Sequence, residues 1–105
     1  MPPGPVERRL RFHPDARADL ARLHDWIARE ANEARAAGYL SRIRDACEAL
    51  SRFPLMGRAD DDLGLGLRVL GFERRAAIVY RVGETTIDIL AVYHGGRDMR
   101  ALGER

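Results

Sequence analysis

The sequence predicts an α+β domain with an N-terminal strand, an antiparallel helical hairpin, and a three-stranded antiparallel meander packed on the helices. Three observations lead to this fold class: an alternating segment near the N-terminus, two segments with helical periodicity, and three short β-rich segments in the second half. A chain of 105 residues can form one hydrophobic core. We expect a disordered lead-in over residues 1–7, which is rich in proline, and a single domain over residues 8–105.

The first expected element is a strand over residues 6–12. Leu10 and Phe12 lie on one face of this strand, and Glu7, Arg9 and Arg11 lie on the other. We therefore expect one buried and one solvated face.

Two amphipathic helices follow. The first begins at residues 13–15, because proline is tolerated in a first turn and Asp15 suits the positive end of the helix dipole, and it ends near residues 29–31. The second begins after the cap residue Asn32 and ends before Pro54, which has no amide proton to donate. Apolar residues repeat along one face of each helix: Ala16, Leu20, Leu23 and Ile27 in the first, and Ala36, Leu40, Ile43, Cys47 and Leu50 in the second.

A loop and three strands complete the expected domain. The loop spans residues 55–66, and the strands span residues 67–72, 76–82 and 85–93. The pair at residues 83–84, with glycine first, fits a type II′ hairpin turn. This turn places Arg81 opposite Thr86 and about 27 Å from His94, at about 3.4 Å per residue. Arg81 and His94 therefore cannot act on one phosphate.

Composition and charge limit the classes of protein to consider. The hydrophobic fraction of 46% and the charged fraction of 32% are typical of a globular domain, and no apolar run approaches the roughly 18 residues that a membrane span requires. The N-terminus has no apolar segment typical of a secretory signal, so we expect a cytoplasmic protein with no membrane partner. A net charge of +2 permits nucleic-acid binding without requiring it.

Metal and nucleophile sites have little support in the sequence. The three consecutive aspartates at residues 60–62 lie in a loop, where neighbouring side chains seldom converge on one ion, so we expect no metal and no cofactor. Cys47 is the only cysteine and lies on an apolar helix face, which indicates a buried thiol. His13 and His24 are interpreted as capping or surface residues.

One cluster is compatible with RNA cleavage by the neighbouring 2′-hydroxyl, a reaction that needs a base, an acid and cations near the phosphate. Arg74, Arg75 and His94 gather at one end of the predicted meander, and Arg97 follows the last strand. The same register places Glu73 opposite His94. The alternative interpretation is therefore that Glu73 and His94 form a salt bridge at the strand end and have no catalytic role.

Four short motifs, in this order along the chain, resemble the ParE/RelE superfamily of bacterial toxins, and the ParE branch most closely. The resemblance covers about residues 8–102. The motifs are FP..GR at residues 53–58, GLR at residues 66–68, AIVYRV at residues 77–82 and VYHGGRD at residues 92–98.

This resemblance implies the toxin of a type II toxin–antitoxin system. Proteins similar to ParE poison DNA gyrase, are associated with plasmid stabilisation, and are neutralised by a small ParD-like antitoxin; operator DNA is bound only through the antitoxin complex. RelE-like relatives instead cut messenger RNA on the ribosome. Two arginine positions of that ribonuclease pattern fall on Ala77 and Gly95 here, and neither residue can stabilise a phosphorane. We therefore expect inhibition through protein contact, with ribosome-dependent endoribonuclease activity as the alternative.

The resemblance also suggests two binding surfaces. We expect the antitoxin to bind the first helix at Arg22, Leu23, Trp26 and Ile27. A tryptophan is a typical interface anchor. The alternative interpretation is that Trp26 is part of the core of the helical hairpin. We expect the target to be contacted by the tail, at Arg97, Met99 and Leu102. The sequence leaves open a homodimer, and also an inactive relative kept as an antitoxin-binding or DNA-regulatory module.

Overall fold

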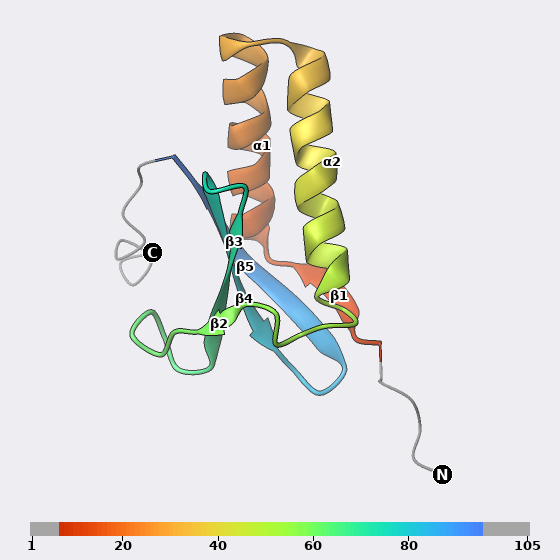
Figure 1. Ribbon diagram of the computed structural model, residues 1–105, viewed down its shortest axis with the longest axis vertical. Helices are drawn as coiled ribbons and strands as arrows, with labels where there is room; N and C mark the ends of the chain where they lie inside the picture. Colours follow the sequence, from red (N-terminus) through yellow and green to blue (C-terminus); the bar gives the residue numbers. More distant parts are fainter. Residues whose placement is uncertain (1–6, 96–105) are drawn as a thin grey trace.

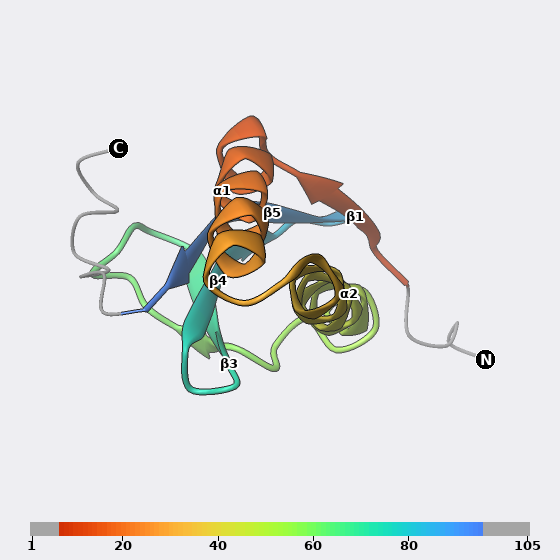
Figure 2. The ribbon, with the colours of Figure 1, turned by 90° about the horizontal axis from the view of Figure 1, so that it is seen from above.

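Two antiparallel helices pack against one face of a five-stranded sheet in the computed structural model, which describes residues 7–95 (Figure 1). The elements are β1 (Arg9–Phe12), α1 (Pro14–Glu30), α2 (Glu33–Ala49), β2 (Arg58–Ala59), β3 (Leu67–Phe72), β4 (Ala76–Val82) and β5 (Thr86–His94). The strand order across the sheet is β1-β5-β4-β3-β2. Seen from above, α1 lies over β4 and β5, and α2 lies beside α1 (Figure 2). The predicted α+β class is confirmed; the lead-in before Glu7 falls outside the described residues.

The predicted helix boundaries are confirmed. His13 is the N-cap of α1, and its Nδ1 accepts the backbone N–H of Asp15 at 3.1 Å. Asn32 is the N-cap of α2, and its side-chain oxygen accepts the backbone N–H of Arg35 at 2.8 Å. Both caps satisfy backbone donors that a first helical turn leaves unpaired. The second helix ends at Ala49, before Pro54 as predicted.

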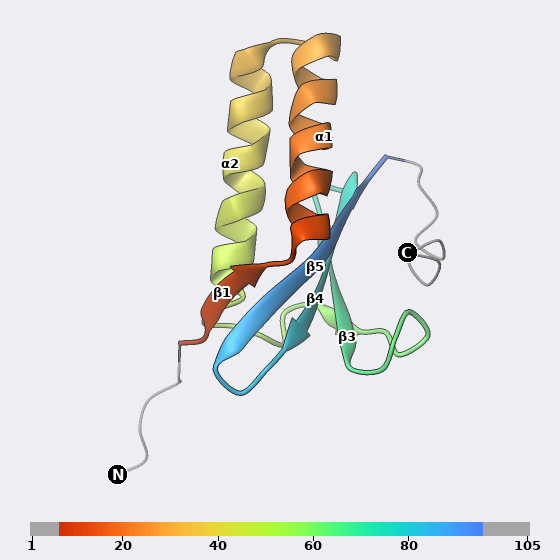
Figure 3. The same ribbon diagram turned by 180° about the vertical axis from the view of Figure 1, so that it is seen from behind.

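The outer strands of the sheet differ from the prediction. The first strand is shorter than expected and pairs in parallel with Thr86–Ile89 of β5 (Figure 3). Its Leu10 and Phe12 pack against the helical core, as predicted. The segment predicted as a loop over residues 55–66 contains β2, which pairs antiparallel with the start of β3.

Near its turn, the predicted register of the β4–β5 hairpin is wrong by two residues, because the turn begins one residue later than expected. The N–H of Gly83 donates to the carbonyl of Thr86 at 2.8 Å, so the turn is formed by residues 84–85. Arg81 consequently lies opposite Asp88 rather than Thr86. A Cβ at position 83 would lie 3.1 Å from Thr86 Oγ1. The glycine therefore permits close approach across the hairpin instead of a special turn conformation.

A β-bulge in β5 decides which side chains face the helices. The pairing with β4 shifts between Ile89 and Ala91, so Leu90 is an extra residue. Ile89 packs in the core beneath the helices; beyond the bulge Val92 takes that face, and Ala91 packs on the opposite face. Because side chains alternate along a strand, an unbulged β5 would turn His94 away from the helices. The bulge instead brings His94 to the helical side.

Both faces of the sheet bury apolar side chains. The cluster beneath the helices contains Ala16, Leu23, Tyr39, Ile43, Cys47, Leu50, Ile78, Tyr80, Ile87, Ile89 and Val92. The cluster on the other face contains Leu67, Val69, Val79, Ala91 and Tyr93, with Leu63 packed against it from the loop before β3. No helix within residues 7–95 is long and apolar enough to cross a membrane.

Candidate functional site

An aromatic cluster, defined here as Trp26, Tyr39 and His94, lies where β5 ends beneath the helical hairpin. The ring centroid of His94 is 5.2 Å from that of Trp26 on α1 and 5.8 Å from that of Tyr39 on α2. Trp26 is 45% exposed, whereas Tyr39 is only 9% exposed. The cluster therefore runs from the surface into the core and joins both helices to the last strand.

Two grooves meet at Trp26 and His94. The helix groove, of about 450 Å³, is lined mainly by α1, including Arg22, Leu23 and Arg29. The turn groove, of about 680 Å³, lies between the hairpin and the β3–β4 turn and is lined by both helices and the strand ends, including Arg35, Tyr39, Arg42, Glu73 and Arg75. Figure 1 shows the β3–β4 turn at the same end of the sheet as the end of β5.

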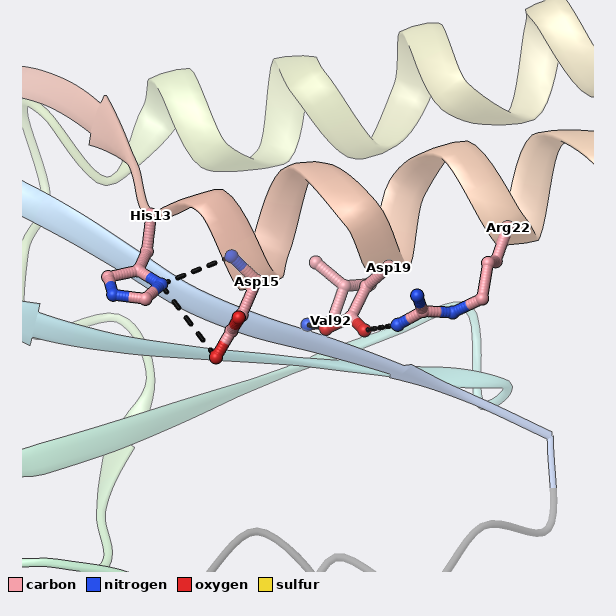
Figure 4. A network of polar contacts seen from close by, with 5 residues as sticks. All are labelled: His13, Asp15, Asp19, Arg22 and Val92. Carbon is pink, nitrogen blue, oxygen red and sulfur yellow. Dashed lines mark hydrogen bonds and ion pairs between the residues drawn. The ribbon is translucent and has the colours of Figure 1, made fainter. Parts of the chain in front are cut away.

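A buried carboxylate, that of Asp19, lines the helix groove, and Figure 4 shows its contacts with Arg22 and Val92. Asp19 is 5% exposed, and its Oδ2 accepts the backbone N–H of Val92 at 2.9 Å. The guanidinium of Arg22 donates to its Oδ1 at 2.6 Å. Asp19 was not among the site residues expected from the sequence, although its spacing of three from Ala16 and four from Leu23 places it on the apolar face of α1.

The β3–β4 turn is held by an ion pair with α2. Glu73 and Arg74 have positive φ angles of 47° and 61°. The guanidinium of Arg42 donates to both carboxylate oxygens of Glu73, at 2.8 Å and 3.3 Å, and this lowers the pKa of Glu73. The predicted pairing of Glu73 with His94 is therefore wrong, since His94 lies opposite Ala76 and Glu73 pairs with α2.

The surroundings of His94 favour its neutral form. Burial lowers its pKa, and the nearby Arg75 guanidinium lowers it further. The backbone carbonyl of Arg75 accepts the N–H of Gly95 at 2.8 Å, which joins the two strand ends. The structure thus brings His94 and Arg75 together, as predicted, but through a different register; Arg74 lies in the turn and is exposed. Arg97 falls outside the described residues.

The residues expected to bind an antitoxin have different environments. Trp26 lines both grooves and is not enclosed in the core of the hairpin. Leu23 is buried and Ile27 is partly buried against the core, so each supports the groove more than it forms an outer surface. Arg22 holds Asp19 and lines the helix groove. Met99 and Leu102, expected to contact a target, fall outside the described residues.

Three of the four sequence motifs meet in one hydrogen-bond network. Tyr80 Oη donates to the carbonyl of Pro54 at 2.7 Å and accepts the N–H of Gly57 at 2.9 Å. The guanidinium of Arg68 donates to the carbonyl of Gly57, from Nη2 at 2.6 Å, and to that of Leu55 at 3.3 Å. A Cβ at position 57 would lie 2.8 Å from Tyr80 Oη. These motif residues therefore position the loop before β2, on which Leu55 remains exposed.

Two of the three loop aspartates, Asp60 and Asp61, make polar contacts near the turn before β3. Asp61 Oδ1 accepts the N–H of Gly66 at 3.2 Å, and Asp60 lies 3.7 Å from the guanidinium of Arg58. Within residues 7–95, no group of three or more histidine, cysteine or acidic side chains is arranged to hold a metal ion.

Comparison with known proteins gives one family model and similar solved structures. Residues 10–99 match the model of the ParE toxin of the type II toxin–antitoxin system, parDE. The chromosomal ParDE system from P. aeruginosa superposes with a TM-score of 0.74 at 22% identity, covering 85% of this chain and 97% of that chain. The toxin–antitoxin complex RelBE2 from Mycobacterium tuberculosis superposes with a TM-score of 0.60 at 25% identity, covering 88% and 95%. No curated protein matches the sequence. Because the family model spans most of the chain, this protein belongs to the ParE toxin family of type II toxin–antitoxin systems.

Proposed function

We propose that this toxin stops bacterial growth by poisoning DNA gyrase in the cytoplasm and is neutralised by an antitoxin encoded beside it. The observation that carries the proposal is the match of residues 10–99 to the ParE toxin, a family of toxin–antitoxin systems. The similar structures are themselves a ParDE system and a RelBE2 toxin–antitoxin complex, which supports an antitoxin partner. Operator DNA is bound through the antitoxin complex, and the tail residues Arg97, Met99 and Leu102 contact the target.

Antitoxin binding uses Trp26 as its anchor. The ring is half-exposed where the two grooves meet, so a partner segment can cover it, and buried tryptophans dominate many interfaces. Trp26→Ala should weaken antitoxin binding by a factor of about 30 or more. The matched control is Phe53→Ala, which removes an exposed aromatic ring that lines neither groove. Equal affinities of the two variants would count against this surface.

The target is tested by inducing the toxin without its antitoxin. Incorporation of thymidine and of methionine over the first minutes reports DNA and protein synthesis. We expect DNA synthesis to fall first, and the purified toxin to inhibit supercoiling by gyrase. No growth defect would favour an inactive relative that only binds antitoxin.

Ribosome-dependent RNA cleavage is the second candidate function, favoured by the proximity of His94 and Arg75 at one groove. A neutral histidine can accept the 2′-hydroxyl proton, and arginines can stabilise the phosphorane. In that reaction Arg74 and Arg97 would be the further cations. His94→Ala should leave gyrase inhibition largely intact and would abolish RNA cleavage. If protein synthesis falls first and His94→Ala is harmless while still folded, the gyrase proposal is wrong.

A further inference from the structure

We propose that the turn groove contains a carboxylate subsite, in which the Tyr39 hydroxyl and the Arg75 guanidinium bind one acidic side chain of the antitoxin. The turn groove, between the hairpin and the β3–β4 turn, is lined by both residues. This inference rests on the proposed antitoxin partner, and it names the chemistry of the segment that the groove receives.

The Tyr39 hydroxyl is the first observation. Tyr39 is nine-tenths buried, and within residues 7–95 its hydroxyl has no hydrogen-bond partner. A buried hydroxyl normally finds a partner, because losing water without a replacement is unfavourable. Its ring is fully engaged, edge-on to Phe72 at 5.5 Å and beneath the guanidinium of Arg42 at 5.5 Å. The packing therefore accounts for the ring and leaves the hydroxyl buried without an acceptor in the described part of the chain.

The charge of the turn groove is the second observation. Arg42 is neutralised by Glu73, whereas Arg35 and Arg75 have no ion-pair partner within residues 7–95, and Glu30 is the remaining acidic residue of the lining. Arg75 lies close enough to Tyr39 and His94 to affect the ionisation of both. The groove thus has a cation beside an unpaired hydroxyl, which suits an anion that accepts two hydrogen bonds.

The residues that line the turn groove indicate whether a peptide or a nucleic acid would bind there. Trp26, Ile27, Ala31, Ala34 and Gly38 form an apolar side along the hairpin. An amphipathic peptide segment has apolar side chains for this wall and a carboxylate for the subsite. A phosphate backbone would instead require a continuous track of cations, and the lining interrupts its arginines with two glutamates. The observations therefore favour an acidic peptide segment.

The test compares three variants of the full chain against the antitoxin encoded beside it, by isothermal titration calorimetry. Tyr39→Phe removes one hydroxyl, Arg75→Gln removes one charge, and Arg74→Gln is the control, since it removes a neighbouring arginine of the turn that does not line the groove. We expect Tyr39→Phe and Arg75→Gln each to weaken binding by a factor of about 10 to 100, as for hydrogen bonds to a charged group, and Arg74→Gln to change it by less than about twofold.

Combining the two substitutions tests whether Tyr39 and Arg75 bind the same carboxylate. If both residues bind one carboxylate, the double variant should bind only slightly more weakly than either single variant. Replacing the acidic residues of the antitoxin one at a time by their amides should then identify one whose loss has no further effect on Arg75→Gln. The thermal midpoint of Tyr39→Phe should not fall, because its hydroxyl has no described partner to lose.

Each other outcome has a clear meaning. If the antitoxin binds the wild type and both variants equally, the subsite is not used and the proposed function stands. If the wild-type chain does not bind the antitoxin at all, the proposed function itself fails. If the two variants keep antitoxin binding but lose binding of a single-stranded RNA oligonucleotide, the anion is a phosphate and the peptide proposal is wrong.

Discussion

The carboxylate of Asp19 on α1 accepts the backbone N–H of Val92 in β5 at 2.9 Å, a contact between residues 73 positions apart. β1 pairs with β5 only as far as Ile89, so a helical side chain supplies an acceptor where the strand partner has ended. This contact anchors α1 to the sheet just before His94. The position of the aromatic cluster therefore depends on a buried carboxylate as well as on apolar packing.

Replacing Asp19 should destabilise the fold. Asp19→Ala removes the acceptor of a buried N–H, and we expect the free energy of unfolding to fall by about 3 kcal/mol. Asp19→Asn keeps an oxygen acceptor and should cost less. The control is Asp25→Ala on the exposed side of the same helix, expected within about 0.5 kcal/mol of wild type. Urea denaturation measures all three; similar values for Asp19→Ala and Asp25→Ala would contradict the role of the contact.

Removing the Tyr80 hydroxyl should loosen the loop before β2. Tyr80→Phe loses the hydrogen bonds to Pro54 and Gly57, and we expect a loss of about 2 kcal/mol in the free energy of unfolding. The amide of Gly57 should exchange with solvent faster in the variant, as measured by NMR. Tyr39→Phe is the matched control, because it removes a buried hydroxyl without a described partner. The prediction fails if both variants have the same stability.

A glycine at position 74 should stabilise the β3–β4 turn. Arg74 has a φ angle of 61°, a conformation that glycine adopts without the steric cost of a Cβ. We expect Arg74→Gly to raise the free energy of unfolding by up to about 1 kcal/mol. Arg17→Gly, within α1, should lower it by about 1 kcal/mol, since glycine disfavours a helix interior. A loss of stability in Arg74→Gly would show that its side chain contributes more than the backbone conformation costs.

The pKa values of His94 and His24 should be shifted in opposite directions from the ordinary value of a histidine. Burial and Arg75 lower the pKa of His94 below 6.5, while hydrogen bonds to Asp25 and Glu33 raise the pKa of His24 above 6.5. NMR titration of the ring protons should resolve both midpoints. Arg75→Gln should raise the pKa of His94, and Glu33→Gln should lower the pKa of His24.

These shifts have opposite effects on stability. The unfolded chain protonates His94 more readily than the folded protein does, so this residue reduces the free energy of unfolding as the pH falls from 6.5 through its folded-state pKa. His24 stabilises the fold when protonated, and this contribution is lost as the pH rises through its folded-state pKa. The His94→Asn variant should therefore lose less stability than wild type between pH 7 and pH 5. A steeper loss in the variant would contradict this assignment.

The Cys47 thiol should be unreactive in the folded protein. The residue is fully buried, and burial raises the pKa of its thiol to about 12, so almost no thiolate exists at pH 7. A disulfide reagent should modify it only at the rate of unfolding, and at once in denaturant. Immediate modification under native conditions would show that α2 opens readily.

The sequence by itself determined the helices and the family. Helical periodicity, the caps at His13 and Asn32, and the stop before Pro54 are local signals, since each acts within a few residues along the chain. The ParE resemblance also follows from linear motifs. Tyr80 and Gly57 belong to two of them, although their contact at 2.9 Å is visible only in the structure.

Only the tertiary structure decided the register of the sheet and hence the site. The β4–β5 turn expected from the sequence lies one residue too early, and the sequence contains no signal for the extra residue Leu90. Strand pairing is non-local, and a shift of one residue exchanges the two faces of a strand, so short apolar runs do not reveal which face is buried. The bulge turns His94 toward Trp26, and because β1 stops pairing at Ile89, the backbone N–H of Val92 donates to Asp19 instead. In both contacts the partner comes from a distant part of the chain, so local sequence signals do not reveal it.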